Sequence, residues 1–179
     1  GYNGQGIAWN LSNGNNYTVP SGKNLYIVML SCDNGSQSFK IDNSRVANGL
    51  FTYISPPSQY FGEEQSLNNP LILTEGQTFS CYYPNTGYMS FYGMLIDKVV
   101  EPITWASPQT YTVPSGKTLY VTNIFNWYSN ATNVGQIFID GIDIANGGFN
   151  SGVTGGSKGK SISSPLVLNA GQTIVIATN

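Results

Sequence analysis

The sequence predicts an all-β protein built from two tandem β-sandwich domains. Three observations lead to this prediction: the chain repeats itself in order, its apolar runs are short and bounded by Gly, Pro and Asn, and no segment has the pattern of a long amphipathic helix. The clearest repeat matches residues 17–26, Tyr-Thr-Val-Pro-Ser-Gly-Lys-Asn-Leu-Tyr, with residues 111–120, where only Asn is replaced, by Thr. Its period of roughly 95 residues is too long for a solenoid unit and has the size of a small domain. We therefore expect domains at 1–98 and 99–179.

Further matches follow in the same order in both copies. They are Ile7-Ala8-Trp9 with Ile103-Thr104-Trp105, Ile41-Asp42 with Ile139-Asp140, Ala47-Asn48-Gly49 with Ala145-Asn146-Gly147, Pro70-Leu71 with Pro165-Leu166, and Gly76-Gln77-Thr78 with Gly171-Gln172-Thr173. The first copy then continues into a segment at 88–96 that has no counterpart before Asn179. We expect the second domain to lack its last strand here, either because a longer protein continues or because a neighbouring chain supplies the strand.

The strands are expected where short apolar and β-branched runs lie between turn residues. In the first copy these runs are 7–9, 17–19, 25–31, 38–41, 45–47, 50–54, 71–73, 78–83 and 90–96. In the second copy they are 103–105, 111–113, 119–125, 136–139, 143–145, 166–168 and 173–177. About eight strands in roughly 95 residues suggest a jelly roll or a related sandwich.

The turns between these strands have recognisable residues. Val-Pro-Ser-Gly, at 19–22 and again at 113–116, places Pro at the second position of a type I turn and Gly at the fourth. The same reasoning applies to Glu75-Gly76 and Ala170-Gly171. Asp140-Gly141 predicts a tight hairpin in which Gly takes a positive φ.

The chain carries very little charge. Charged residues make up 9% of it and the formal net charge is −2, whereas an ordinary soluble domain has about 25% charged residues. A chain with so few Lys and Arg is not expected to bind nucleic acid, which requires clustered basic residues. It has no apolar run long enough to span a membrane. A surface with so few charged residues offers little electrostatic repulsion between copies of the chain and is compatible with dense assembly.

Catalytic and metal-binding patterns are not recognisable. The chain contains no histidine, which removes the Ser–His and Cys–His nucleophile systems and the main nitrogen ligand of zinc. Carboxylates occur at Glu63-Glu64, Glu75, Asp140 and Asp143, but no pair of them is repeated in a form that suggests two facing acids. For Asp140 and Asp143, a role at the end of a hairpin is favoured over calcium binding. We expect no enzyme activity, no cofactor and no metal.

Aromatic residues and cysteines provide the remaining candidates. Tyr60, Phe61, Trp127 and Tyr128 lie in loops near Gly and Asn, where they could stack on sugars or anchor a partner protein. Core packing or subunit contact is the favoured role, and sugar binding is the alternative. Cys32 and Cys81 both fall in the first copy; two buried thiols are favoured, with one disulfide as the alternative.

The repeated Tyr-Thr-Val-Pro-Ser-Gly-Lys-x-Leu-Tyr opening, the Ile-Asp hairpin and the Pro-Leu-x-Leu-x-x-Gly-Gln-Thr segment resemble tandem jelly-roll β-modules of phage and virion spike proteins or bacterial surface proteins. The resemblance covers nearly the whole chain and implies no catalytic residue. It implies a non-enzymatic structural or attachment protein (a spike, fibre or vertex protein) that acts through assembly and host-surface contact. The expected partners are other subunits, as in a homo-oligomer, and the expected place is the virion surface or outside the cell. The alternative function is a carbohydrate-binding module that uses loop aromatics, with glycans as partners.

Overall fold

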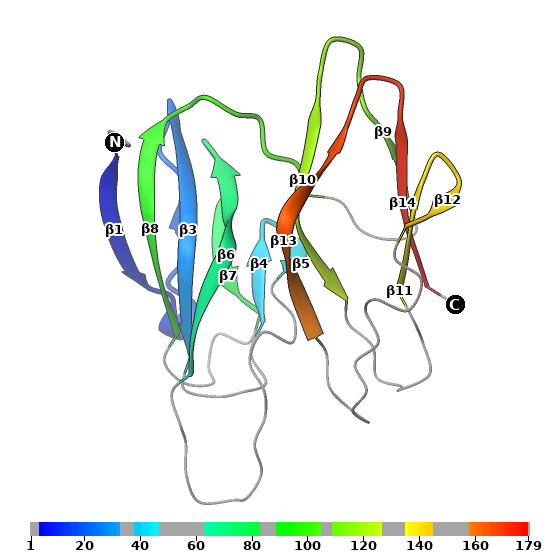
Figure 1. The fold of residues 1–179 in the computed structure, drawn as a ribbon. Coiled ribbons are helices and arrows are strands. Elements are labelled where there is room, and N and C mark those ends of the chain that lie inside the picture. Colours follow the sequence, from blue (N-terminus) through cyan, green and yellow to red (C-terminus); the bar gives the residue numbers. More distant parts are fainter. Residues whose placement is uncertain are drawn as a thin grey trace, which may run out of the picture. The chain divides into compact units, whose positions relative to one another are not determined.

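A computed structural model of the chain describes residues 4–32, 38–46, 63–82, 89–104, 109–126, 135–144 and 158–178. These residues form antiparallel β-sheets and one short 3-10 helix, η1 (Ser12–Gly14), so the all-β prediction is confirmed (Figure 1). The chain divides into two compact units, Gly1–Thr104 and Trp105–Asn179. The boundary between them lies a few residues beyond the predicted division at 98/99.

The first unit contains two four-stranded sheets. Their strand orders are β1-β8-β3-β6 and β2-β7-β4-β5. The strands are β1 (Gln5–Asn10), β2 (Tyr17–Thr18), β3 (Lys23–Cys32), β4 (Phe39–Ile41), β5 (Ser44–Val46), β6 (Glu63–Thr74), β7 (Thr78–Cys81) and β8 (Met89–Asp97). In Figure 1, β8 lies between β1 and β3. The first and last strands of the unit are therefore neighbours in one sheet.

Aromatic side chains join the two sheets of the first unit. Phe91 of β8 meets Tyr17 of β2 and Phe79 of β7 edge-on, each with a centroid distance of 5.5 Å. Phe79 also stacks on Phe39 of β4 at 5.3 Å. Because the two contacts of Phe91 cross from one sheet to the other, the sheets pack face to face as a sandwich.

The second unit repeats part of this arrangement. One sheet has the order β12-β11-β14-β9 and corresponds to β5-β4-β7-β2; the other contains β10 and β13, which correspond to β3 and β6. The strands are β9 (Thr110–Thr112), β10 (Leu119–Asn126), β11 (Gly135–Ile139), β12 (Ile142–Asp143), β13 (Lys158–Leu168) and β14 (Thr173–Thr178). Counterparts of β1 and β8 are absent from the described part of the second unit.

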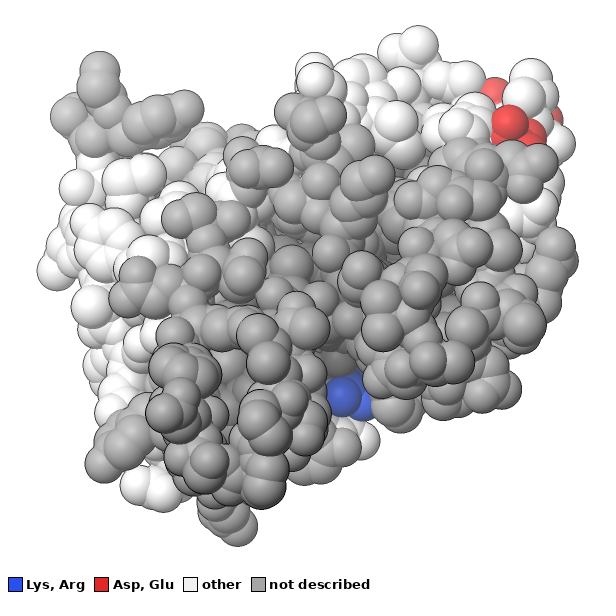
Figure 2. Space-filling view, turned by 60° about the horizontal axis from the view of Figure 1, so that its bottom comes forward, with Lys and Arg blue, Asp and Glu red and all other residues white. Residues whose placement is uncertain are grey.

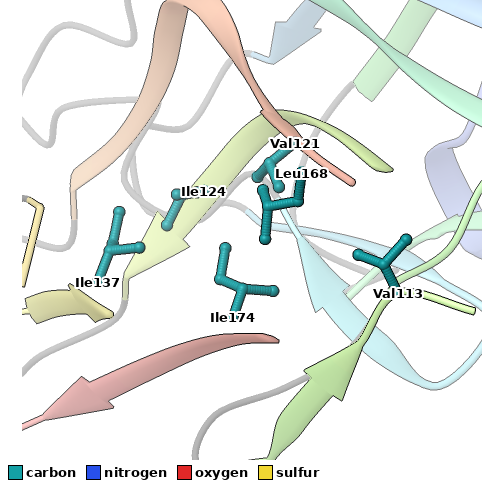
Figure 3. Packing of buried hydrophobic residues seen from close by; sticks show 6 residues of the cluster. All are labelled: Val113, Val121, Ile124, Ile137, Leu168 and Ile174. Atoms are coloured by element: carbon teal, nitrogen blue, oxygen red, sulfur yellow. The ribbon is translucent and has the colours of Figure 1, made fainter. Parts of the chain in front are cut away.

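The core of the second unit is small and aliphatic. Figure 3 shows the buried side chains of β10, β11, β13 and β14 converging on one region, with Val113 beyond the end of β9. The cluster consists of Val113, Val121, Ile124, Ile137, Leu168 and Ile174. At the position of Phe79 in the first unit, the second unit has Ile174.

The predicted strand at Ile103–Trp105 is wrong at Ile103 and Thr104, which are not in a strand; Trp105 lies outside the described residues. In the first unit the matching strand is β1, and β1 pairs only with β8. The described part of the second unit has no counterpart of β8, so Ile103 and Thr104 have no strand of that kind to pair with. The predicted strand at 50–54 also lies outside the described residues.

Both units contain the same irregularity in their central strand. The register of β3 against β6 and β8 shifts between Ile27 and Met29, and that of β10 against β13 shifts between Val121 and Asn123. The extra residues, Val28 and Thr122, are equivalent in the repeat. The duplication therefore includes a β-bulge as well as the strands.

The turns form at the predicted places, with one shift in register. The Lys23 N–H donates to the Pro20 carbonyl at 3.3 Å, and Gly22 has a φ of 72°. The hydrogen-bonded turn therefore begins at Pro20, one residue later than predicted, with Gly at its third position, as in a type II turn. The second copy repeats this geometry at Pro114 and Gly116.

A buried asparagine holds the segment that leaves β8. The Asn24 side chain is fully buried; its Oδ1 accepts from the backbone N–H groups of Val99 (2.8 Å) and Val100 (3.2 Å). Its Nδ2 donates to the carbonyls of Leu73 and Val100. Asn24 thus satisfies the backbone of residues 99–100 much as a strand would. This contact explains why the first unit extends past residue 98.

Candidate functional site

The four loop aromatics singled out in the sequence, Tyr60, Phe61, Trp127 and Tyr128, lie outside the described residues. Their roles stay predictions. Among the described residues, a depression lies on the outer face of the β1-β8-β3 sheet of the first unit.

The depression forms because small side chains occupy the middle of the outward face. Along β8, Phe91 points into the sandwich, so its neighbours Ser90 and Tyr92 point outward. Strand pairing places Tyr92 opposite Ala8 of β1 and Met29 of β3. The cavity has a volume of about 440 Å³ and is lined by Ala8, Trp9, Asn10, Met29, Ser31, Ser90, Phe91 and Tyr92.

We call this depression the outer-face groove. It combines an exposed aromatic ring with small polar side chains. The Tyr92 side chain is 46% exposed. Ser90 pairs with Asn10 on one side and Ser31 on the other, so polar side chains from three strands lie in one row. The Asn10 Oδ1 accepts from the backbone N–H of Ser12 at 2.8 Å, which fixes the orientation of that side chain. An aromatic face beside hydroxyl and amide groups suits a ligand with one apolar face and several hydroxyls.

The most strongly perturbed carboxyl group, Glu75, is part of a turn and not of a reactive cluster. One of its oxygens accepts from the Gly22 N–H at 2.7 Å and from the Ser21 hydroxyl at 3.1 Å, and the other pairs with Lys98 Nζ at 2.8 Å. The Gly22 N–H bond, followed by the Lys98 and Ser21 bonds, lowers the pKa of Glu75 to about 2. Such a group stays ionised and cannot serve as a proton donor near neutral pH.

Asp140 also has a structural role. Its Oδ1 accepts from the backbone N–H and the hydroxyl of Thr173, and its Oδ2 accepts from Gln172 Nε2 at 2.8 Å. The Thr173 N–H bond, followed by the Gln172 bond, lowers the pKa of Asp140. Asp143 has a different partner, Gln136 Nε2 at 3.2 Å. These hydrogen bonds support the predicted role of Asp140 at the end of a hairpin.

Groupings of three or more His, Cys, Asp and Glu side chains that could hold a metal ion do not occur in the described part of the chain. Nor do the described ranges contain a helix long and apolar enough to cross a membrane.

The two cysteines are buried thiols and do not form a disulfide in the structure. Cys32 ends β3 and Cys81 ends β7, so they come from opposite sheets. The Cys81 Sγ donates to the Leu11 carbonyl at 3.2 Å. Burial, with a smaller contribution from Cys32, raises the pKa of Cys81 to about 12. Its thiol is therefore protonated and weakly nucleophilic at neutral pH.

Comparison of the chain with protein-family models, with curated proteins and with solved structures found no match.

Sequence reasoning did not find the groove because its residues are ordinary on their own. Ala8, Ser31 and Ser90 are small strand residues from three distant segments. The one available signal was Tyr92, an aromatic residue that alternates with the inward-facing Phe91 and Gly93 and must therefore face outward. The partners of Tyr92 became visible only with the strand order.

Proposed function

We propose that the chain is a non-enzymatic structural and attachment component of a virion or cell surface, built from two jelly-roll modules. The observation that carries this proposal is the strand order. Two facing four-stranded sheets with the orders β1-β8-β3-β6 and β2-β7-β4-β5 support a jelly roll, an eight-stranded double sheet in which the chain winds as two Greek keys.

The second unit supports the same interpretation. Its four-stranded sheet, β12-β11-β14-β9, reproduces one jelly-roll sheet strand for strand, and β10-β13 reproduces the centre of the other. Repeated modules of this kind are well suited to building extended surface structures, because each copy adds the same scaffold. The duplication is thus an argument for an architectural role.

The surface agrees with a role in assembly. Figure 2 shows a face on which charged side chains of the described residues appear in only two small places, one basic and one acidic. Three large hydrophobic side chains of the second unit are each more than half exposed: Tyr120, Ile142 and Val167. A nearly uncharged surface with exposed apolar groups favours contact between subunits.

The oligomeric state tests this function. Light scattering of the purified chain across a concentration series should give a defined homo-oligomer, such as a trimer or a pentamer. A monomer at all concentrations would count against the structural role. The Val167→Ser variant should weaken the oligomer if the exposed apolar face of the second unit contributes to it. Val99→Ser in the first unit makes the same substitution at a side chain that is 70% exposed, and serves as the matched control.

A second candidate function, carbohydrate binding, is supported by the outer-face groove. Tyr92 provides an exposed ring for stacking on a sugar, and Ser31, Ser90 and Asn10 stand beside it. A glycan array with the wild-type chain, followed by the Tyr92→Ala variant, tests this candidate. Binding that falls at least tenfold in the variant would support it. Glycan binding that persists in Tyr92→Ala would point to the loop aromatics Tyr60, Phe61, Trp127 and Tyr128 instead.

A further inference from the structure

The two central strands, β3 and β10, have different surroundings although their sequences are equivalent. β3 pairs with β6 on one edge and with β8 on the other. β10 pairs with β13, and no described strand lies along its other edge. In Figure 1, β8 covers the edge of β3 that is equivalent to this open edge of β10.

The inward face of the second unit shows the effect of the open edge. Leu25 in β3 is fully buried, whereas its equivalent Leu119 in β10 is only half-buried. Likewise, Leu71 in β6 is buried, whereas its equivalent Leu166 in β13 is only half-buried. In the first unit, β8 contributes Met89, Phe91 and Leu95 to the core, and each of these side chains is buried. The second unit has the apolar residues that such a strand would cover.

The sequence of β10 is that of an interior strand. Edge strands are usually protected from pairing by charges, by proline or by bulges that turn the edge away. The outer strands β6 and β13 each contain a proline, Pro70 and Pro165. Residues 119–126 of β10 read Leu-Tyr-Val-Thr-Asn-Ile-Phe-Asn, with neither proline nor charge. β10 does contain a bulge, but β3 has the equivalent bulge and is paired on both edges, so the open edge of β10 has the composition of an interior strand.

The bulge sets a steric condition on any strand that pairs with this edge. In the first unit Gly93 of β8 lies opposite Ile27, immediately before the register shift. A Cβ atom at Gly93 would lie 2.5 Å from the Tyr26 carbonyl oxygen and 3.2 Å from the Ile27 Cα. Only glycine fits there. Because the second unit has the same bulge at Val121–Asn123, the matching position of an added strand also requires glycine.

We propose that the open edge of β10 binds one extended polypeptide strand with the residue pattern of β8, supplied by another protein chain. The strand runs antiparallel to β10 and places alternate apolar side chains on the core. If this strand pairs with β10 as β8 pairs with β3, a glycine lies opposite Val121. Its residues equivalent to Leu95 and Phe91 then lie opposite Leu119 and Ile124. This is pairing by β-sheet augmentation. The inference stands on the comparison of the two units and does not rest on the proposed function.

The test uses the whole 179-residue chain and a synthetic peptide with the sequence of residues 89–97, extended by lysines for solubility. The peptide should bind in a saturable 1:1 manner, measured by fluorescence anisotropy. Hydrogen-exchange mass spectrometry should show new protection in peptides that cover Leu119–Asn126. Protection should also increase around Leu166 as the core becomes covered.

Three altered peptides give matched controls that leave the protein unchanged. A peptide with Gly93→Val should bind at least tenfold more weakly, because its side chain would meet the bulge. Two further peptides carry backbone N-methyl groups on the two alternate sets of residues. The peptide whose methyl groups face β10 should lose binding, and the peptide whose methyl groups face away should keep it. Equal binding of the two methylated peptides would rule out edge pairing.

Other outcomes would overturn the proposal. Absence of saturable binding up to millimolar peptide would do so, as would protection that appears in Lys23–Cys32 instead of Leu119–Asn126. The same holds if two copies of the chain pair through β10 and the peptide does not dissociate them. In that case the edge would be an interface between copies, detected as a dimer by analytical ultracentrifugation.

Discussion

Gln77 donates from its Nε2 to Oδ2 of Asp42 at 3.1 Å, and this bond connects two turns of the first unit. The Asp42 Oδ1 accepts from the backbone N–H of Thr78 at 2.9 Å. Gln172 and Asp140 repeat the same pair at 2.8 Å in the second unit. Both aspartates have a positive φ, 54° for Asp42 and 50° for Asp140. That conformation is uncommon for residues other than glycine, so the carboxylate bonds help to hold it.

Loss of the Asp140 carboxylate should destabilise the second unit. In Asp140→Ala the three hydrogen bonds that the carboxylate accepts from Gln172 and Thr173 are lost, and alanine tolerates the positive φ less well than aspartate. We expect Tm to fall by several degrees and hydrogen exchange at Thr173 to accelerate. Asp140→Asn should have a smaller effect, since asparagine tolerates the conformation. Asp42→Ala provides the matched control, because it should accelerate exchange at Thr78 and leave Thr173 unchanged.

Acid should weaken the first unit through Glu75. Its pKa is lowered from 4.5 to about 2 in the folded chain. The stabilisation is therefore present above pH 4.5 and is lost as the pH falls toward 2, because the unfolded chain binds the proton first. Urea denaturation between pH 6 and 2.5 should show this loss in the wild type and a reduced loss in Glu75→Gln. The second unit has Ala170 at this position. An unchanged pH profile in Glu75→Gln would contradict the assignment.

Substitution of Gly93 should disrupt the pairing of β8 with β3. The added Cβ would come within 2.5 Å of the Tyr26 carbonyl oxygen, which belongs to the backbone and has little room to move. We expect Gly93→Ala to cost about 1–3 kcal/mol of unfolding free energy, as overpacking does in other cores. Gly6→Ala on β1 is the control, because its Cβ would meet only the end of the Tyr92 side chain at 3.3 Å. Equal stability of the two variants would refute this explanation.

The thiol of Cys81 should be unreactive in the folded chain. Burial raises its pKa to about 12, so almost none of it is thiolate at pH 8. We expect a thiol reagent such as a dithio-nitrobenzoate to modify Cys81 only after denaturant is added. Mass mapping of the labelled chain distinguishes Cys81 from Cys32. Rapid labelling of Cys81 without denaturant would show that the interior opens on the time scale of the reaction.

The sequence was sufficient for the features that depend on local chemistry. The Asp140-Gly141 hairpin forms as predicted, with φ values of 50° and 79°, because these residue types tolerate positive φ. The register of the Val-Pro-Ser-Gly turn was not predicted correctly. Proline fits the first two positions of such a turn, and only the positive φ of Gly22 distinguishes the two registers.

Features that depend on distant pairing could not be predicted. Val28 and Thr122 are ordinary strand residues, so nothing in their type marks a bulge. The contact between Asn24 and residues 99–100 also joins segments far apart in the sequence, and no local pattern predicts it. Of the residues that line the groove, none was predicted, because strand order alone brings β1, β8 and β3 together.

Two ion pairs of the first unit lie close together in the sequence. Asp97 pairs with Lys23 and Lys98 pairs with Glu75, each at 2.8 Å, where the chain leaves β8. Salt screens exposed pairs of this kind and leaves apolar contacts and buried hydrogen bonds largely intact. Raising the ionic strength should therefore weaken the chain locally, at the two ion pairs where it leaves β8. The hydrogen bonds of the buried Asn24 continue to hold residues 99–100.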